Sequence, residues 1–203
     1  MLSKARVCVL VSGGGTNLQA IIDACQSGII KSAEVSVVVA SNPGAYALER
    51  AKNNGIPTEV VHKKMMPSQQ EFEQKIIDII EKYQIDFIVL AGFMCILSED
   101  FTSRYPEKII NVHPSLIPSF CGKGFYGLKV HEAALDYGVK VTGATVHFVN
   151  EIPDGGRIIM QKAVATEDGD TPEILQKRVM EQAEWIILPQ SVEKVAKEIL
   201  NRR

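Results

Sequence analysis

The chain has 203 residues, 46% of them hydrophobic and 23% charged, which is typical of a globular protein that can bury a sizeable core. A formal net charge of −2 and an isoelectric point near 6.1 give no overall attraction for nucleic acid. The apolar runs are too short for a signal peptide or a membrane span, and the four cysteines form no CxxC pair or metal-like spacing. We therefore expect a cytoplasmic protein with reduced thiols and with neither a membrane nor a nucleic-acid partner.

Strand-like and helix-like segments alternate in the first half of the chain. Runs of apolar and β-branched residues predict strands at residues 7–11, 35–39, 58–61, 87–90 and 109–112. Helix-like segments lie between them at residues 18–25, 45–52 and 72–80, and Ser98 opens a further helix. Ser68 and Glu71 have the spacing of a capping box ahead of the third helix. This alternation predicts an α/β fold with a doubly wound, mainly parallel sheet.

The second half of the chain has a different pattern. Two extended, β-branched runs at residues 139–149 and 158–165 leave no room for a helix between them, which predicts an antiparallel strand pair appended to the sheet. Thr171 then caps a C-terminal helix that has a proline in its first turn. Pro189 should kink or divide that helix. No repeat or linker interrupts the chain, so we predict a single domain over residues 1–203.

The end of the fifth predicted strand carries two polar side chains. Asn111 and His113 stand two positions apart after an apolar run, and such residues of a strand project from the same face. Pro114 then ends the strand. An amide donor beside a proton-transfer group is what acyl transfer requires, so an enzyme is the first hypothesis. Taken alone, His113 also suits a structural histidine.

A glycine loop at residues 13–15 joins the first strand to the first helix. Backbone N–H groups at a helix N-terminus favour a phosphate, and glycines let it approach closely. The same loop equally suits a tight turn in which Thr16 or Asn17 caps the helix. Leu18 in place of the third glycine disfavours a dinucleotide fingerprint, and the absence of a following Gly-Lys-Ser/Thr excludes a P-loop. A monophosphate ligand remains compatible.

Four other polar residues have more than one interpretation. His147 lies in an alternating strand that would bury it, which favours a structural role. His131 sits in a helical segment and only neighbours the site, and His62 has no motif around it. Asp154 precedes two glycines, where an aspartate is usually a turn former. Only convergence with His113 would give Asp154 a special role.

Five segments of the chain carry a resemblance to a known family. They are Ser12–Leu18, Leu90–Met94, Asn111–Pro118, Val146–Val149 and Asp154–Gly156. Segments of this kind occur in the same order in the folate-dependent formyltransferases, which the chain resembles over essentially its whole length. Within that family, the glycine loop and the short length resemble the members that formylate glycinamide ribonucleotide in purine synthesis.

The resemblance implies a reaction and roles for three residues. The amine of glycinamide ribonucleotide would attack the formyl carbon of the co-substrate 10-formyltetrahydrofolate, and a tetrahedral intermediate would collapse to release tetrahydrofolate. Neither a metal nor a covalent enzyme intermediate is required. Asn111 would stabilise the oxyanion through its side-chain N–H, and His113 would be the general acid. Asp154 would favour the charged form of His113 by proximity.

The resemblance also implies how the nucleotide binds. Backbone N–H groups of Gly15, Thr16 and Asn17 would hold the substrate phosphate, in agreement with the helix-terminus argument. Glu184 matches a family position that holds the ribose hydroxyls. An exposed helical glutamate is the alternative for Glu184.

The folate should lie on another wall of the site. By the resemblance, the pterin would contact Met94, Cys95, Ile96, Leu97 and Asn111. Cys95 and Gln69 stand where family members often have basic residues, so those contacts with folate are absent here. The loop at residues 120–127 is rich in glycine and aromatic residues and would cover the site as a lid. Residues 1–110 would then form the half that binds the nucleotide phosphate, and residues 111–203 the catalytic and folate-binding half.

Other functions are compatible with parts of the pattern. A sugar-nucleotide or other small-amine formyltransferase would use the same chemistry on a different acceptor. A non-catalytic phosphate-binding domain would use the glycine loop but leave Asn111 and His113 unexplained. The length and the net charge disfavour a methionyl-tRNA formyltransferase, which carries a further tRNA-binding domain. Both a monomer and a homodimer are compatible with the sequence.

Overall fold

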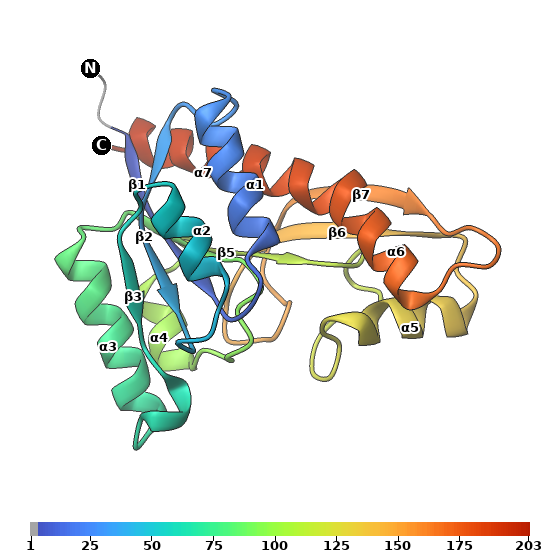
Figure 1. The fold of residues 1–203 in the computed structure, drawn as a ribbon, viewed down its shortest axis with the longest axis horizontal. Coiled ribbons are helices and arrows are strands. Elements are labelled where there is room, and N and C mark those ends of the chain that lie inside the picture. Colours follow the sequence, from blue (N-terminus) through green and yellow to red (C-terminus); the bar gives the residue numbers. More distant parts are fainter. Residues whose placement is uncertain (1–3) are drawn as a thin grey trace.

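The computed structural model describes residues 4–203 (Figure 1). The strands are β1 (Ala5–Val11), β2 (Ala33–Ala40), β3 (Thr58–Val60), β4 (Phe87–Leu90), β5 (Ile109–His113), β6 (Val141–Phe148) and β7 (Ile158–Ala165). The α-helices are α1 (Thr16–Gln26), α2 (Ala47–Asn53), α3 (Gln69–Lys82), α4 (Glu99–Arg104), α5 (Leu128–Tyr137), α6 (Pro172–Val179) and α7 (Trp185–Asn201). A 3-10 turn, η1 (Lys63–Met65), and a π-helical turn, η2 (Met180–Glu184), complete the elements of this part of the chain.

The strands form a seven-stranded sheet in the order β3-β2-β1-β4-β5-β6-β7. β1 to β5 run parallel, whereas β6 is antiparallel to β5 and β7 is antiparallel to β6. The predicted α/β fold is therefore confirmed, including the mainly parallel sheet, the appended antiparallel pair and the C-terminal helix. Residues 1–3, which belong to the predicted domain, lie outside the described part of the chain.

Alternate residues of β1 face two different helical layers. Val7, Val9 and Val11 pack in the core beneath α1, α2, α6 and α7. Cys8 and Leu10 pack in a second core beneath α3 and α4. All five side chains are fully buried, which explains why the strand is apolar at every position rather than at every second one.

The carboxyl ends of β1 and β4 lie side by side where the strand order reverses. The chain turns toward β2 after β1 and toward β5 after β4, and this divergence opens a crevice at the sheet edge. The Ser12 N–H donates to the Gly92 carbonyl oxygen (3.1 Å), and the Ser12 Oγ accepts from the Met94 N–H (2.9 Å). These bonds hold the two loops together at the rim of the crevice.

The N-caps of three helices agree with the sequence. The Ser68 and Ser98 side chains cap α3 and α4, and Thr171 caps α6, as predicted. Pro189 lies inside α7, and the wide turn η2 precedes it. A proline ring clashes with the carbonyl four residues earlier, here that of Trp185, which lies where η2 gives way to α7. The C-terminal helix is thus divided at η2, ahead of the proline, and α7 continues through Pro189.

Candidate active site

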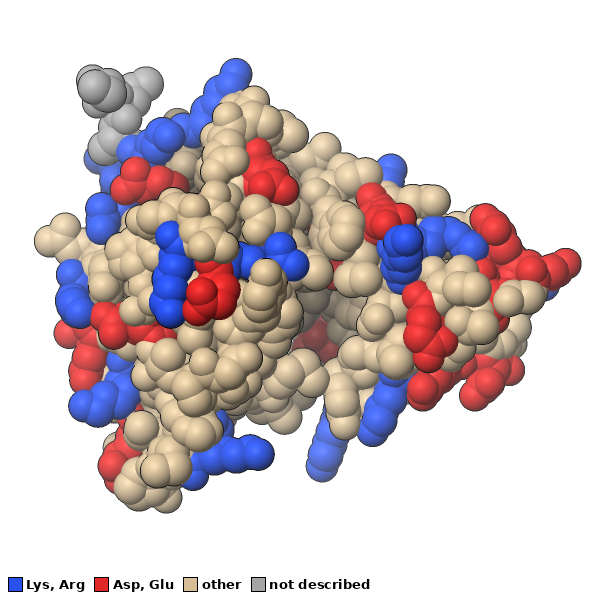
Figure 2. All heavy atoms as spheres, in the orientation of Figure 1, with Lys and Arg blue, Asp and Glu red and all other residues tan. Residues whose placement is uncertain are grey.

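A cleft of about 730 Å³ lies at the carboxyl ends of the central strands. Figure 2 shows the surface hollowed between the body that carries the parallel strands and the lobe of β6, β7 and α5, with acidic atoms visible deep in the hollow. β5 continues through His113, so Asn111 and His113 both line the cleft from one face of the strand. His113 is 4% exposed. The structure thus brings together the two residues that the strand pattern paired.

Asp154 converges with His113 from the turn after β6. Its Oδ2 lies 3.5 Å from His113 Nδ1, a charge contact longer than a strong hydrogen bond. His113 Nε2 lies 2.8 Å from the carbonyl oxygen of Phe120. Burial lowers the pKa of His113 below its ordinary value, although Asp154 and the Phe120 carbonyl act in the opposite direction. Asp154 therefore favours the imidazolium, as the resemblance implied, but desolvation outweighs it and leaves the imidazole uncharged at neutral pH.

The turn that carries Asp154 has an unusual backbone. Asp154 has a φ of 57°, in the left-handed region that residues other than glycine rarely adopt. A Cβ at Gly156 would collide with the last carbonyl group of β6, so this position requires glycine. Burial raises the pKa of Asp154, but contacts with His147 and His113 and a bond from the Gly122 N–H (2.8 Å) bring it below its ordinary value. The carboxylate is therefore ionised beside His113.

His147 belongs to the same constellation, although the sequence favoured a structural role for it. The register of β6 places it directly opposite Asn111 of β5. Its Nε2 lies 3.3 Å from Asn111 Nδ2 and 3.5 Å from Asp154 Oδ1, and its Nδ1 lies 2.8 Å from the Phe148 carbonyl oxygen. His147 Nε2 therefore contacts both the Asn111 amide and the Asp154 carboxylate, and so fixes their positions relative to each other. The sequence predicts the strand that contains His147, but it does not predict the register between β5 and β6 that places His147 opposite Asn111.

Gly15 begins α1, so the expectation that Thr16 or Asn17 caps this helix is wrong. Gly15 is the N-cap residue with a φ of 74°, and no side chain caps the helix. A Cβ at Gly15 would lie 2.6 Å from Ala47 Cβ, so both the backbone conformation and the packing against α2 require glycine. The first N–H groups of α1 therefore have no side-chain partner.

Asn17 contacts Glu184 instead of the helix backbone. Asn17 Nδ2 donates to Glu184 Oε2 (2.7 Å), and the two residues are 9% and 6% exposed. Burial raises the pKa of Glu184 to about 6, although the bond from Asn17 acts in the opposite direction. Both residues line the cleft. The alternative of an exposed helical glutamate is therefore wrong.

The predicted folate-binding residues divide between two hollows. Those that line the cleft are Met94, Cys95, Ile96 and Asn111. Leu97 lies in the core, 8% exposed, and reaches only an adjoining hollow of about 140 Å³ that residues 150–154 complete. Cys95, Ile96 and Asn111 line both hollows. Gln69 Nε2 donates to the Ile96 carbonyl oxygen (3.1 Å), so this side chain braces the loop after β4.

The loop at residues 120–127 closes the cleft opposite the loop after β4, and Gly122 to Gly127 line it. Phe120 has a φ of 48°, again in the left-handed region, and its carbonyl oxygen is the partner of His113 Nε2. The Gly122 N–H donates to Asp154. One loop therefore contacts both members of the imidazole–carboxylate pair.

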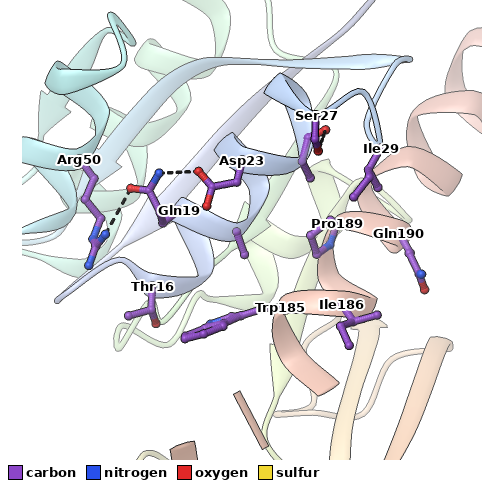
Figure 3. Close-up of a pocket in the computed structure, with 12 residues that line it drawn as sticks. Thr16, Gln19, Asp23, Ser27, Ile29, Arg50, Trp185, Ile186, Pro189 and Gln190 are labelled. Carbon is purple, nitrogen blue, oxygen red and sulfur yellow. Dashed lines mark hydrogen bonds between the residues drawn. The ribbon is translucent and has the colours of Figure 1, made fainter. Parts of the chain in front are cut away.

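A further pocket of about 410 Å³ lies between α1 and α7 (Figure 3). Trp185 and Ile186 of α7 line it together with Gln19 of α1, and Arg50 Nη1 donates to Gln19 Oε1 (3.2 Å). Thr16 lines this pocket, whereas the next residue lines the cleft, so the first turn of α1 separates the two spaces. Of the three predicted phosphate-binding residues, Asn17 therefore lines the cleft, Thr16 lines this further pocket, and Gly15 lines neither space.

Residues 4–203 contain neither a metal-binding cluster of side chains nor a helix that could span a membrane. No group of three or more His, Cys, Asp or Glu side chains in this part of the chain is arranged to hold a metal ion. No helix within the same residues is long and apolar enough to cross a membrane.

The fold and the cleft define an α/β protein in which an amide, an imidazole and a carboxylate converge beside a helix N-terminus. Residues 5–192 match the formyl transferase family, and the chain belongs to this family.

Individual relatives are similar to the chain over most of its length. The human trifunctional purine biosynthetic protein adenosine-3 is 44% identical over 193 residues, which are 95% of this chain and 18% of that protein. The phosphoribosylglycinamide formyltransferase of Haemophilus influenzae is 42% identical over 184 residues, 91% of this chain and 84% of that protein. The crystal structure of glycinamide ribonucleotide transformylase 1 from Symbiobacterium toebii has a TM-score of 0.89 at 38% identity and covers 96% of this chain and 89% of that one.

The relatives differ from the chain in length. The chain spans 18% of the human and bovine trifunctional proteins and 61% of the chloroplastic phosphoribosylglycinamide formyltransferase of Arabidopsis thaliana. The similarity therefore concerns one part of these longer proteins.

Proposed function

We propose that this protein transfers the formyl group of 10-formyltetrahydrofolate to the amine of glycinamide ribonucleotide. The observation that carries the proposal is the convergence of Asn111, His113 and Asp154 in one cleft beside the first turn of α1. Relatives similar to nearly the whole chain are named for this activity. The reaction belongs to purine biosynthesis.

The proton transfers follow from the charge state of the site. The substrate amine attacks the formyl carbon, and Asn111 donates its side-chain N–H to the oxyanion that forms. Since burial lowers the pKa of His113, its neutral imidazole first accepts the proton that the attacking nitrogen releases. The imidazolium, stabilised by the ionised Asp154, then protonates the folate nitrogen as the bond from that nitrogen to the formyl carbon breaks. Tetrahydrofolate leaves, and His113 is neutral again.

The two ligands would enter from different sides of His113. The N–H groups of Gly15, Thr16 and Asn17 suit the phosphate because no side chain caps α1. The Glu184 carboxylate suits the ribose hydroxyls, since it is buried at the wall of the same cleft. The pterin suits the loop after β4 and the adjoining hollow.

The loop at residues 120–127 must change its contacts during the reaction. His113 Nε2 is bonded to the Phe120 carbonyl, and Asp154 Oδ2 faces the other ring nitrogen. Both ring nitrogens therefore lie against protein oxygens, and the one N–H of the neutral imidazole can donate to only one of them. His113 reaches the substrate only when one of these contacts opens. This requirement favours a lid role for the loop.

The decisive measurement is steady-state formyl transfer with glycinamide ribonucleotide and 10-formyltetrahydrofolate. We expect His113→Ala to lower kcat by about 10²- to 10⁴-fold, the usual contribution of a general acid–base group. His62→Ala is the matched control, since His62 lies outside the cleft. Unchanged turnover in His113→Ala would refute the mechanism.

An assay with a second acceptor tests the alternative function, formyl transfer to a sugar nucleotide. If the wild-type protein fails with glycinamide ribonucleotide but formylates an amino-sugar nucleotide, the chemistry stands and the acceptor is wrong. If neither acceptor reacts, a phosphate-binding protein without catalysis is the better account.

The proposal also covers the domain organisation of the chain and its location in the cell. We propose one domain in which residues 1–110 bind the nucleotide phosphate and residues 111–203 supply catalysis and the folate site. The described cysteines are free thiols, which suits a reducing cytoplasm.

A further inference from the structure

His131 is a buried imidazole at the wall of the cleft without a hydrogen-bond partner. It is the fourth residue of α5, is 0% exposed and lines the same cleft as His113. Within residues 4–203 neither its Nδ1 nor its Nε2 has a partner. A buried polar group left unpaired costs about 1–3 kcal/mol, so such a group needs an explanation.

The other two imidazoles near the cleft differ from His131 in this respect. His113 has partners at both ring nitrogens, the Phe120 carbonyl and Asp154. His147 likewise contacts the Phe148 carbonyl at one nitrogen and Asn111 and Asp154 at the other. Among the three imidazoles, His131 is therefore the one with no polar partner at either ring nitrogen within residues 4–203.

The position of His131 indicates which ligand reaches it. The cleft that His131 lines is also lined by Gln176 and Glu184 from the C-terminal helices. The adjoining hollow, formed by the loop after β4 and residues 150–154, does not include His131. Asn111 and Asp154 line both spaces, as do Cys95 and Ile96 of the loop after β4, so the reacting groups lie at their junction. His131 lines the cleft alone, as Asn17 and Glu184 do, and this shared position favours the nucleotide as its ligand.

The charge state of His131 restricts the kind of ligand group that it can bind. Burial, together with the nearby His113, lowers its pKa to about 4, so at neutral pH it is an uncharged imidazole with one N–H donor and one acceptor. A phosphate oxygen only accepts hydrogen bonds and an ammonium only donates them, so neither ligand would use both nitrogens of a neutral imidazole. A neutral carboxamide offers an oxygen and an N–H of the matching kind.

We propose that His131 is a substrate-positioning residue whose neutral imidazole donates a hydrogen bond to the carboxamide oxygen of the amino-nucleotide's glycinamide arm. The bond would hold that arm between Glu184 and His113 and so direct the amine at the formyl carbon. The inference rests on the proposed function, because the carboxamide belongs to the acceptor named there.

The test compares His131→Leu with His131→Asn in binding and steady-state assays. We expect His131→Leu to raise the Kd and KM for glycinamide ribonucleotide roughly 3- to 10-fold, the value of one lost neutral hydrogen bond. The KM for 10-formyltetrahydrofolate should stay at the wild-type value. His131→Asn retains an N–H donor and should restore most of the nucleotide affinity, and His62→Leu should change nothing.

A measurement on the wild-type protein makes the test independent of the variants. With ¹⁵N-labelled histidine, adding glycinamide ribonucleotide should shift the ring-nitrogen resonances of His131, and adding a folate analogue alone should not. A shift with the folate analogue but not with the nucleotide would overturn the assignment. So would wild-type nucleotide affinity in a folded His131→Leu, because a buried water or a purely structural histidine would account for that result.

The outcomes separate this inference from the proposed function. If the wild-type protein formylates glycinamide ribonucleotide while His131→Leu binds it normally, only the role of His131 fails. If the wild-type protein neither binds nor formylates this nucleotide, the proposed function fails and the role of His131 fails with it.

Discussion

Glu184 should make the protein less stable as the pH rises. Its pKa is about 6 in the folded protein, against an ordinary value of 4.5, because burial disfavours the charged form more than the bond from Asn17 supports it. The folded state therefore holds the Glu184 proton more tightly than the unfolded chain does. Protonated Glu184 contributes stability that is fully present below pH 4.5 and is lost as the pH rises to about 6.

The magnitude follows from the same two values. A difference of about 1.5 units at about 1.4 kcal/mol per unit gives about 2 kcal/mol between acid and neutral pH. Glu184→Gln removes the titrating proton and retains an oxygen that accepts from Asn17. The free energy of unfolding of this variant, minus that of the wild type, should therefore rise by about 2 kcal/mol between about pH 4 and about pH 7.5.

Urea denaturation of both proteins across this pH range measures the difference directly, and contributions from other titrating groups cancel in the comparison. Glu181→Gln is the matched control, because Glu181 lies in the same turn η2 but is exposed. A difference that stays flat with pH for Glu184→Gln would refute the reasoning, since it would mean that water reaches the carboxylate. The variant should also bind the nucleotide more weakly, so the gain in stability would come with a loss of function.

Two further substitutions test the remaining parts of the site. Asn111→Ala should lower kcat by about 10²- to 10³-fold with little change in either KM, because the amide is used only when the oxyanion forms; a changed KM with an unchanged kcat would contradict this role. Gly15→Ala should destabilise the protein by at least about 1–2 kcal/mol, because its φ of 74° is left-handed and the new Cβ would meet Ala47. Gly14→Ala is the control, with nothing within 4 Å of the added Cβ and no positive φ, and equal melting temperatures for the two variants would show that Gly15 is not constrained.

The sequence predicted the parts of the site that depend on local periodicity. A strand presents alternate residues on one face, so the spacing of Asn111 and His113 alone predicts that both side chains point into one site. The continuous apolar runs likewise indicated buried parallel strands, and the change after residue 138 indicated an antiparallel pair. The glycine loop indicated an exposed helix N-terminus, but the capping side chains expected there are absent because Gly15 itself is the N-cap.

The tertiary structure decided what depends on contacts between distant segments. His147 contributes because the register between β5 and β6 sets it opposite Asn111, and a shift of one residue would turn its side chain to the other face. Asp154 meets His113 because a left-handed turn and a glycine required by close packing bring its carboxylate back over the sheet edge. Asn17 and Glu184 are paired by the packing of α1 against the C-terminal helices.

There is a physical reason why the sequence predicts some features of this site and not others. Periodicity records which face of an element is buried, and that information is carried by neighbours along the chain. Register, turn conformation and burial of a charged group arise from the sum of many weak contacts over the whole domain. By itself, the sequence therefore determined the α/β layers and the Asn111–His113 pair at the end of β5. The resemblance named Asp154 and Glu184 as expected site residues. Only the tertiary structure decided that these two and His147 surround the pair, and that Glu184 is buried enough to hold a proton near pH 6.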